Sequence, residues 1–167
     1  DDSAIYLNTT YPGYTNVSAE SMFRNCKKLF SAEIGINMSI RGLENTSNMF
    51  MDCVLYSHNI NFPSSIKNSS GMFRGCTSFN KDVIFNSSGM YNDMNTSDMF
   101  RDCVSFNSNL INITKLNCDN AFQMFCGSTI FDKKVPDLVR PYASANHAST
   151  NLSRMFVLCD RFNQKIN

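Results

Sequence analysis

Apolar and polar residues follow one pattern along this 167-residue chain, and the pattern recurs six times. Each copy opens on a Met-Phe pair, and successive methionines are 27, 23, 27, 25 and 31 residues apart. In five copies a cysteine comes four residues after the methionine, and in five an aromatic residue comes seven after it. A repeat of about 26 residues therefore organises the chain. The pairs are Met22-Phe23, Met49-Phe50, Met72-Phe73, Met99-Phe100, Met124-Phe125 and Met155-Phe156.

These apolar positions share one face of a helix with about 3.6 residues per turn. The residues between them are polar, as in Arg101-Asp102. In four copies a serine stands two residues before the methionine, where its hydroxyl can cap the first helical turn. The pattern predicts a two-turn amphipathic helix at each Met-Phe pair. The capping serines are Ser47, Ser70, Ser97 and Ser153.

An aliphatic residue follows four positions after the closing aromatic residue of each copy, and three copies add another apolar residue two positions later. This period of two predicts a short strand with one buried face. The first residues of these strands are Ile34, Ile60, Val83, Leu110, Val135 and Ile166. Neither a two-turn helix nor a short strand is stable alone, so each unit needs its neighbours. The expected fold class is an α/β repeat solenoid, similar to a leucine-rich-repeat protein, with six units, one sheet face and one helix face.

We expect residues 18–167 to form the six units of a single domain, and residues 1–17 to form an N-terminal cap. Within the cap, Ile5 to Leu7 would add a strand to the first unit, and Tyr11 to Tyr14 would fold back as a turn. At the other end only Ile166 begins a sixth strand. Because open strand edges recruit other strands, we expect further chain, a second copy or a partner subunit to cover the C-terminal edge.

The charge is nearly balanced, with 15 basic and 14 acidic residues, so nucleic acid is not an expected partner. No run of 18 apolar residues exists, and we expect no membrane span in this segment. The 43% of apolar residues, 14 phenylalanines among them, is enough for a continuous core.

Seven cysteines raise the question of disulfide bonds. The number is odd, and five of them recur at one position of the predicted helix face, where a free cysteine behaves as a small buried apolar residue. We expect these five to be reduced core residues. Cys118 and Cys126 lie outside this series, and a bridge between them is the alternative. The five are Cys26, Cys53, Cys76, Cys103 and Cys159.

Asparagine is abundant, with 22 residues, and one of them stands four residues before the methionine in five copies. Four of these belong to Asn-x-Ser/Thr sequons, but Asn120 does not. A fixed repeat position predicts that the side chain bonds backbone groups in a turn, with glycosylation as the alternative. The sequon residues are Asn45, Asn68, Asn95 and Asn151.

Catalytic chemistry finds little support in the sequence. The two histidines, His58 and His147, fall in different units, and the paired C-x-x-C spacing of a zinc site is absent. No glycine-rich phosphate-binding motif occurs. Since a thiolate is disfavoured at a core position, we expect no catalytic, cofactor or metal site, and a protein that is not an enzyme.

The string Met-Phe-x-x-Cys-x-x-Phe-Asn is intact at Met72–Asn80, Met99–Asn107 and Met155–Asn163. Over residues 18–167 the chain resembles the BspA-type leucine-rich-repeat family of bacterial and protist surface proteins. The resemblance implies an extracellular or cell-surface location and an adhesive or binding role. The tryptophan common in that family's strand segment is absent, and Ser128 replaces the cysteine of the fifth unit, which indicates a divergent member.

Two functions follow as hypotheses. The first is a surface-exposed binding or adhesion module that presents its repeat scaffold to a protein or glycan partner. The alternative is a structural assembly component, such as a virion decoration or a surface-particle subunit, located at the cell or virion surface. The longest interval between units, residues 136–151, is either a spacer or a partner-binding loop with Pro141, Tyr142 and His147 as its candidate residues.

Overall fold

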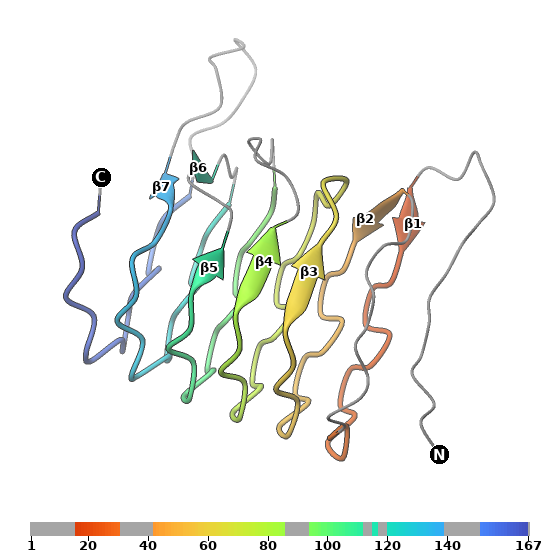
Figure 1. Cartoon of the computed structure of the whole chain (residues 1–167), viewed down its shortest axis with the longest axis horizontal. Coiled ribbons are helices and arrows are strands. Elements are labelled where there is room, and N and C mark those ends of the chain that lie inside the picture. Colours follow the sequence, from red (N-terminus) through yellow and green to blue (C-terminus); the bar gives the residue numbers. More distant parts are fainter. Residues whose placement is uncertain are drawn as a thin grey trace, which may run out of the picture.

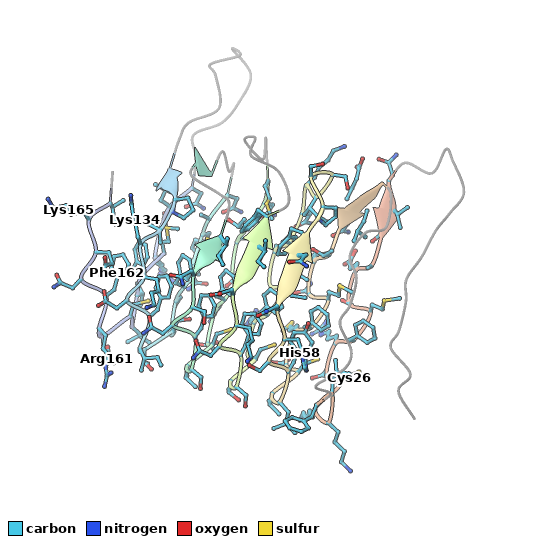
Figure 2. All side chains as sticks on the ribbon, in the orientation of Figure 1. Cys26, His58, Lys134, Arg161, Phe162 and Lys165 are labelled. Carbon is cyan, nitrogen blue, oxygen red and sulfur yellow. The ribbon has the colours of Figure 1, made fainter. Side chains whose placement is uncertain are left out.

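The computed structural model describes residues 16–30, 42–85, 94–111, 115–116, 120–138 and 151–166. Within these ranges the secondary structure consists of short parallel strands. Successive repeats lie side by side in chain order (Figure 1), with Cys26 at one end of the stack and Phe162 at the other (Figure 2). The strands are β1 (Val17–Ser18), β2 (Leu43–Asn45), β3 (Ile60–Phe62), β4 (Val83–Phe85), β5 (Leu110–Ile111), β6 (Lys115–Leu116) and β7 (Asp137–Leu138).

The strands form three parallel groups: β1 with β2, β3 with β4 and β5, and β6 with β7. The predicted strand starts at Ile60, Val83 and Leu110 are confirmed. Val135 and Ile166 are not in strands, and Ile34 lies outside the described residues. A proline, Pro136, stands in the fifth repeat at the place of Ile84 and Ile111, and it has no N–H to donate to a parallel ladder. Of the predicted N-terminal cap, residues 1–15 also lie outside the described residues.

The predicted helices do not form in the described part of the chain. At the Met-Phe pairs the backbone makes a run of turns instead, closed by hydrogen bonds such as Arg101 N to Asp98 O (3.1 Å) and Cys103 N to Phe100 O (3.2 Å). The amide between them, that of Asp102, donates to Cys126 O of the next repeat at 2.8 Å. Because alternate amides bond between repeats, the i to i−4 ladder of an α-helix cannot form. The prediction of an α/β repeat solenoid with a helix face is therefore wrong.

Left-handed backbone at two positions of each repeat also prevents an α-helix. The residue before the methionine and the third residue after it have positive φ; in the fourth repeat these are Asp98 (56°) and Asp102 (58°). Positive φ at the third residue of a four-residue turn is the signature of a type II turn, and it interrupts a right-handed helix. Asparagine, aspartate and glycine tolerate this conformation best. They occupy most of these positions, as in Asn48, Gly71 and Gly75.

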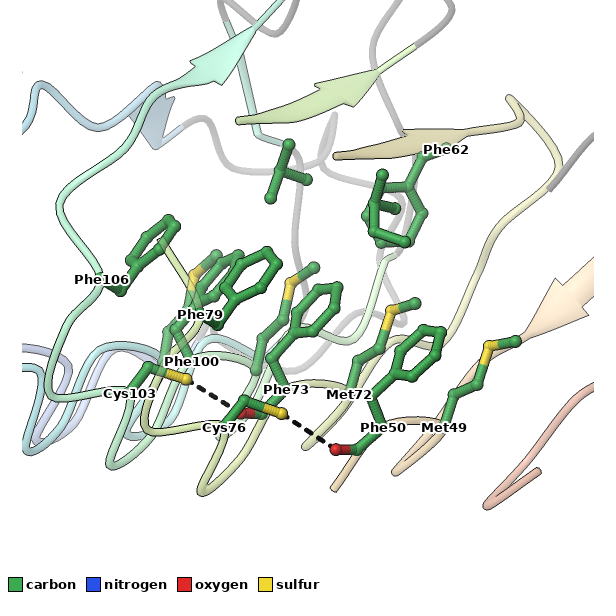
Figure 3. Packing of buried hydrophobic residues seen from close by; sticks show 14 of the residues in the cluster. Met49, Phe50, Phe62, Met72, Phe73, Cys76, Phe79, Phe100, Cys103 and Phe106 are labelled. Carbon is green, nitrogen blue, oxygen red and sulfur yellow. Dashed lines mark hydrogen bonds between the residues drawn. The ribbon is translucent and has the colours of Figure 1, made fainter. Parts of the chain in front are cut away.

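Aromatic ladders run through the core from repeat to repeat (Figure 3). The phenylalanines after the methionines stack face to face, for example Phe73 on Phe100 with ring centroids 5.6 Å apart. The closing aromatic residues form a second ladder, with Phe79 on Phe106 at 5.6 Å. The two ladders stack on each other within a repeat, as Phe100 on Phe106 at 4.4 Å. In the interior repeats the apolar positions identified in the sequence are thus the core positions, although the backbone that carries them is not helical.

Candidate functional site

A row of side-chain donors links the core to the backbone. In the second, third, fourth and sixth repeats, the cysteine four residues after the methionine donates its thiol to the carbonyl of the phenylalanine in the preceding repeat, as Cys76 Sγ to Phe50 O and Cys103 Sγ to Phe73 O, both 2.9 Å (Figure 3). In the fifth repeat the hydroxyl of Ser128 makes the same bond, to Phe100 O at 2.7 Å. The departure from the repeat pattern therefore preserves the interaction.

These thiols are structural groups. All six described cysteines are unpaired, which confirms the expectation of reduced cysteines. Cys53, Cys76 and Cys103 are buried as expected, whereas Cys159 is only partly buried and Cys26 is exposed. Burial raises the pKa of Cys53 and of Cys159 to about 11, and it raises the pKa of Cys103 well above the ordinary range. A protonated thiol is a poor nucleophile. Cys126 is unpaired as well, and Cys118, its candidate partner, lies outside the described residues.

The asparagine four residues before each methionine shapes the turn, as predicted. Its Oδ1 accepts a bond from the amide two residues later, at 3.0 Å in each of the five described cases. Parallel bridges also join these residues between repeats. The asparagine row therefore fixes both the turn and the stacking register. Its members are Asn45, Asn68, Asn95, Asn120 and Asn151.

Of the residues that looked chemically active, the structure describes His58. His58 packs edge-on against Tyr56, with ring centroids 5.6 Å apart, and burial, assisted by the charge of Lys81, lowers its pKa. Pro141, Tyr142 and His147, the candidate partner-binding loop, lie outside the described residues. No group of three His, Cys, Asp or Glu side chains that could hold a metal ion occurs in the described ranges.

The backbone between repeats is joined by one recurring set of four hydrogen bonds. Where the fifth repeat meets the sixth, Gln123 N donates to Ser153 O at 3.1 Å and Phe125 N to Met155 O at 3.0 Å. The set is completed by Ala121 N to Asn151 O and Gly127 N to Val157 O, both 2.9 Å. The same four positions bond at the other junctions between described repeats.

The sixth repeat presents the next set of donors. By position these are the amides of Leu152, Arg154, Phe156 and Leu158, and within residues 151–166 and the other described ranges they have no acceptor. Beside them lies a hollow of about 390 Å³. Its lining is mainly apolar: Leu152, Arg154, Met155, Phe156, Val157 and Ile166. We call these residues, together with Leu158, the C-terminal edge.

Leu158 stands out in this edge. Its φ is 59° and its side chain is 65% exposed, although the same position holds Asp52, Gly75 and Asp102 in earlier repeats. A leucine in left-handed backbone is strained, and strained residues concentrate at functional sites. Ile166 of this edge could be identified from the sequence, whereas Leu158 was not predicted. The signal was available as a leucine in a series otherwise made of Asn, Asp and Gly.

A second surface lies on the outer side of the three-stranded sheet. Asn61, Ile84 and Ile111 are in register across β3, β4 and β5. In β3 and β4 the flanking residues are buried, so this middle row points outward with Asn61 exposed and Ile84 partly exposed. The row offers a narrow, partly apolar strip to a partner.

These features define a repeat protein of stacked irregular coils, with an edge of backbone donors that have no acceptor among the described residues. A family model described as "Mycoplasma protein of unknown function, DUF285" matches residues 17–138 and 55–167, so the chain belongs to this family. The match is compatible with the resemblance to BspA-type repeats. No curated protein and no solved structure matches the chain. Among the described residues, no helix is long and apolar enough to cross a membrane.

Proposed function

We propose that the chain is a non-catalytic protein-binding module that works in assembly, and that its C-terminal edge takes up the backbone of another repeat coil. The observation that carries this proposal is the row of amides at Leu152, Arg154, Phe156 and Leu158. They occupy the positions that bond to a neighbouring coil at the junctions between described repeats.

Backbone and side chains would contribute differently to binding. Main-chain hydrogen bonds along an open edge give affinity with little dependence on the partner's sequence. The apolar hollow beside them selects for a side chain of matching shape. Exposed apolar residues add burial on binding, at about 25 cal/mol per Å² of apolar surface removed from water. Among them are Leu152, Val157, Leu158 and Ile166.

Adhesion to a host protein or glycan is the second candidate function. The outward row of Asn61, Ile84 and Ile111 supports it, because an exposed strip on a rigid sheet can contact a partner without rearrangement. An extracellular or cell-surface location, or a place on a virion, is part of the proposal in either case.

A fusion tests whether the edge accepts a coil. Residues 85–111, appended after Asn167, would supply a complete fourth-repeat coil in the register of the stack. Hydrogen exchange should then slow at the amides of Leu152, Phe156 and Leu158, and the free energy of unfolding should rise. The control carries the same segment with its methionine and phenylalanine, the equivalents of Met99 and Phe100, replaced by serine. Unchanged exchange at these amides in the intact fusion would overturn the proposal.

A further inference from the structure

The first coil of the chain has features that match the C-terminal edge. We infer that a second copy of this chain supplies the coil, and that residues 16–30 of one molecule stack on residues 151–166 of another. This inference rests on the proposed function, since it names the partner of the same edge. The two coils lie at opposite ends of the stack (Figure 1), so one molecule can use both at once.

The backbone acceptors of the first coil fit the donors. In later repeats the carbonyls two residues before the methionine, at the methionine and two residues after it accept bonds from the preceding coil, as those of Ser47, Met49 and Met51 do. The equivalent carbonyls of the first coil belong to Glu20, Met22 and Arg24. The described residues provide no donor for them.

The thiol of Cys26 supplies the clearest link between the two ends. In each of the next three repeats this cysteine donates to a phenylalanine carbonyl in the preceding coil. Cys26 is exposed, while Phe156 O has no thiol donor within the described part of the chain. Stacking a second copy on the edge brings these two groups together in the arrangement that the interior repeats already use.

The apolar ladders continue across the same junction. Met22 is 48% exposed, whereas its equivalents Met49, Met72 and Met99 are fully buried. In the stacked arrangement Met22 would lie against Met155, and the ring of Phe23 would extend the ladder that ends at Phe156. The junction would thereby bury the same side-chain types as the interior junctions.

Such a contact joins different surfaces of the two molecules. A head-to-tail contact without closing rotation produces open chains of molecules, not a symmetric dimer. The inference therefore predicts concentration-dependent growth beyond a dimer, which sedimentation velocity can measure.

Two single substitutions separate the two surfaces. Leu152→Asp blocks the C-terminal edge, because Leu152 is 41% exposed here whereas its equivalents Ser69, Thr96 and Ala121 are fully buried in the interior repeats, so stacking would bury the new carboxylate. Met22→Glu blocks the first coil at an exposed site. Each variant alone should lose self-association. An equimolar mixture should form a 1:1 dimer and stop there, because only one pair of intact surfaces remains.

Labelling of Cys26 reports on the contact itself. Iodoacetamide should modify this thiol in dilute protein, and peptide mass spectrometry should show its protection at concentrations where the chain associates. Cys26→Ser should associate normally, since Ser128 makes the equivalent bond, whereas Cys26→Lys should not. The lysine variant also replaces Met22→Glu in the mixing experiment if that protein fails to fold.

The outcomes distinguish this inference from the proposed function. If the unmodified chain remains monomeric at its highest soluble concentration, or if the mixture forms no dimer, a second copy is not the partner. The fusion experiment can still succeed in that case, and the edge would then accept a coil from another source. If the fusion also leaves the edge amides unprotected, both proposals fail.

Discussion

The hydroxyl of Ser128 donates a hydrogen bond of 2.7 Å to the backbone carbonyl of Phe100 in the preceding repeat. Cys103 makes the equivalent bond to Phe73 through its thiol, at 2.9 Å. The position therefore requires a small buried donor, and two chemically different residues meet that requirement. The stack is held in register by such bonds as well as by its aromatic ladders.

Replacing Ser128 should show which property matters. Ser128→Ala removes the donor and should lower the free energy of unfolding by about 1–2 kcal/mol. Ser128→Cys restores the donor used elsewhere and should cost less. Urea denaturation of the two variants measures the difference. Equal losses would mean that the size of the side chain, and not its hydrogen bond, decides the position.

Gly75 is required by both its backbone and its neighbour. Its φ is 72°, and a Cβ placed there would clash with Oδ1 of Asp52 in the preceding repeat. Gly75→Ala should cost about 1–2 kcal/mol from the left-handed backbone alone, and the clash adds to this. In an Asp52→Gly background, the destabilisation that comes from the clash should disappear. Thermal unfolding of the four proteins of this double-mutant cycle gives the coupling free energy between Asp52 and Gly75. A coupling free energy of zero would mean that the two residues act independently.

The asparagine row can be tested at its centre. Asn95 Oδ1 accepts the amide of Ser97 at 3.0 Å. Asn95→Ala leaves that amide without its acceptor and should cost about 1 kcal/mol, while Asn95→Asp keeps an acceptor and should cost less. Both variants lose the sequon, so protein made in a glycosylating host provides the comparison. Equal destabilisation of both variants only in that host would assign the position to glycan attachment.

The buried thiols make the fold sensitive to alkali. Burial raises the pKa of Cys53 and of Cys159 from 9.0 to about 11, so near pH 10 the unfolded chain has lost protons that the folded chain keeps. Their contribution to stability is complete below pH 9 and is lost as the pH rises toward 11. The double variant Cys53→Ser, Cys159→Ser should show a shallower decline of the free energy of unfolding over this range. If the double variant and the unmodified chain lose stability equally over this range, the alkaline loss of stability comes from other groups.

The aromatic ladder should dominate the stability of the repeats. Phe100 is fully buried and stacks on Phe73, Phe106 and Phe125. Phe100→Ala should cost about 3–5 kcal/mol. Arg101→Ala removes partly exposed contacts, namely ion pairs with Asp98 (3.2 Å) and Asp102 (3.4 Å) and a hydrogen bond to Gln123 (2.9 Å), and should cost at most about 1 kcal/mol. Calorimetry that finds similar losses at both sites would contradict the packing described for this coil.

The repeat period, the core positions and the role of the asparagines could all be read from the sequence. Side chains that stack on their own equivalents must recur at fixed spacing, so the Met, Phe, Cys and Asn series carried this information directly. Strands at Ile60, Val83 and Leu110 followed from the period of two for the same reason. The candidate edge was only partly visible, through Ile166.

The backbone conformation and the donor edge were decided by the tertiary structure. The spacing of Met99, Phe100, Cys103 and Phe106 fits one face of a helix, but it fits a run of turns equally well, because both bring these side chains to one side. The choice depends on where the amides bond. A neighbouring coil offers carbonyls at alternate positions, as Met124 does to Phe100. Each coil therefore satisfies its backbone hydrogen bonds by stacking, and a helix within one coil is no longer the way to satisfy them. That preference exists only between repeats, so no single repeat contains it. The alternate amides from Leu152 to Leu158, which have no acceptor within the described residues, are its consequence at the sixth coil.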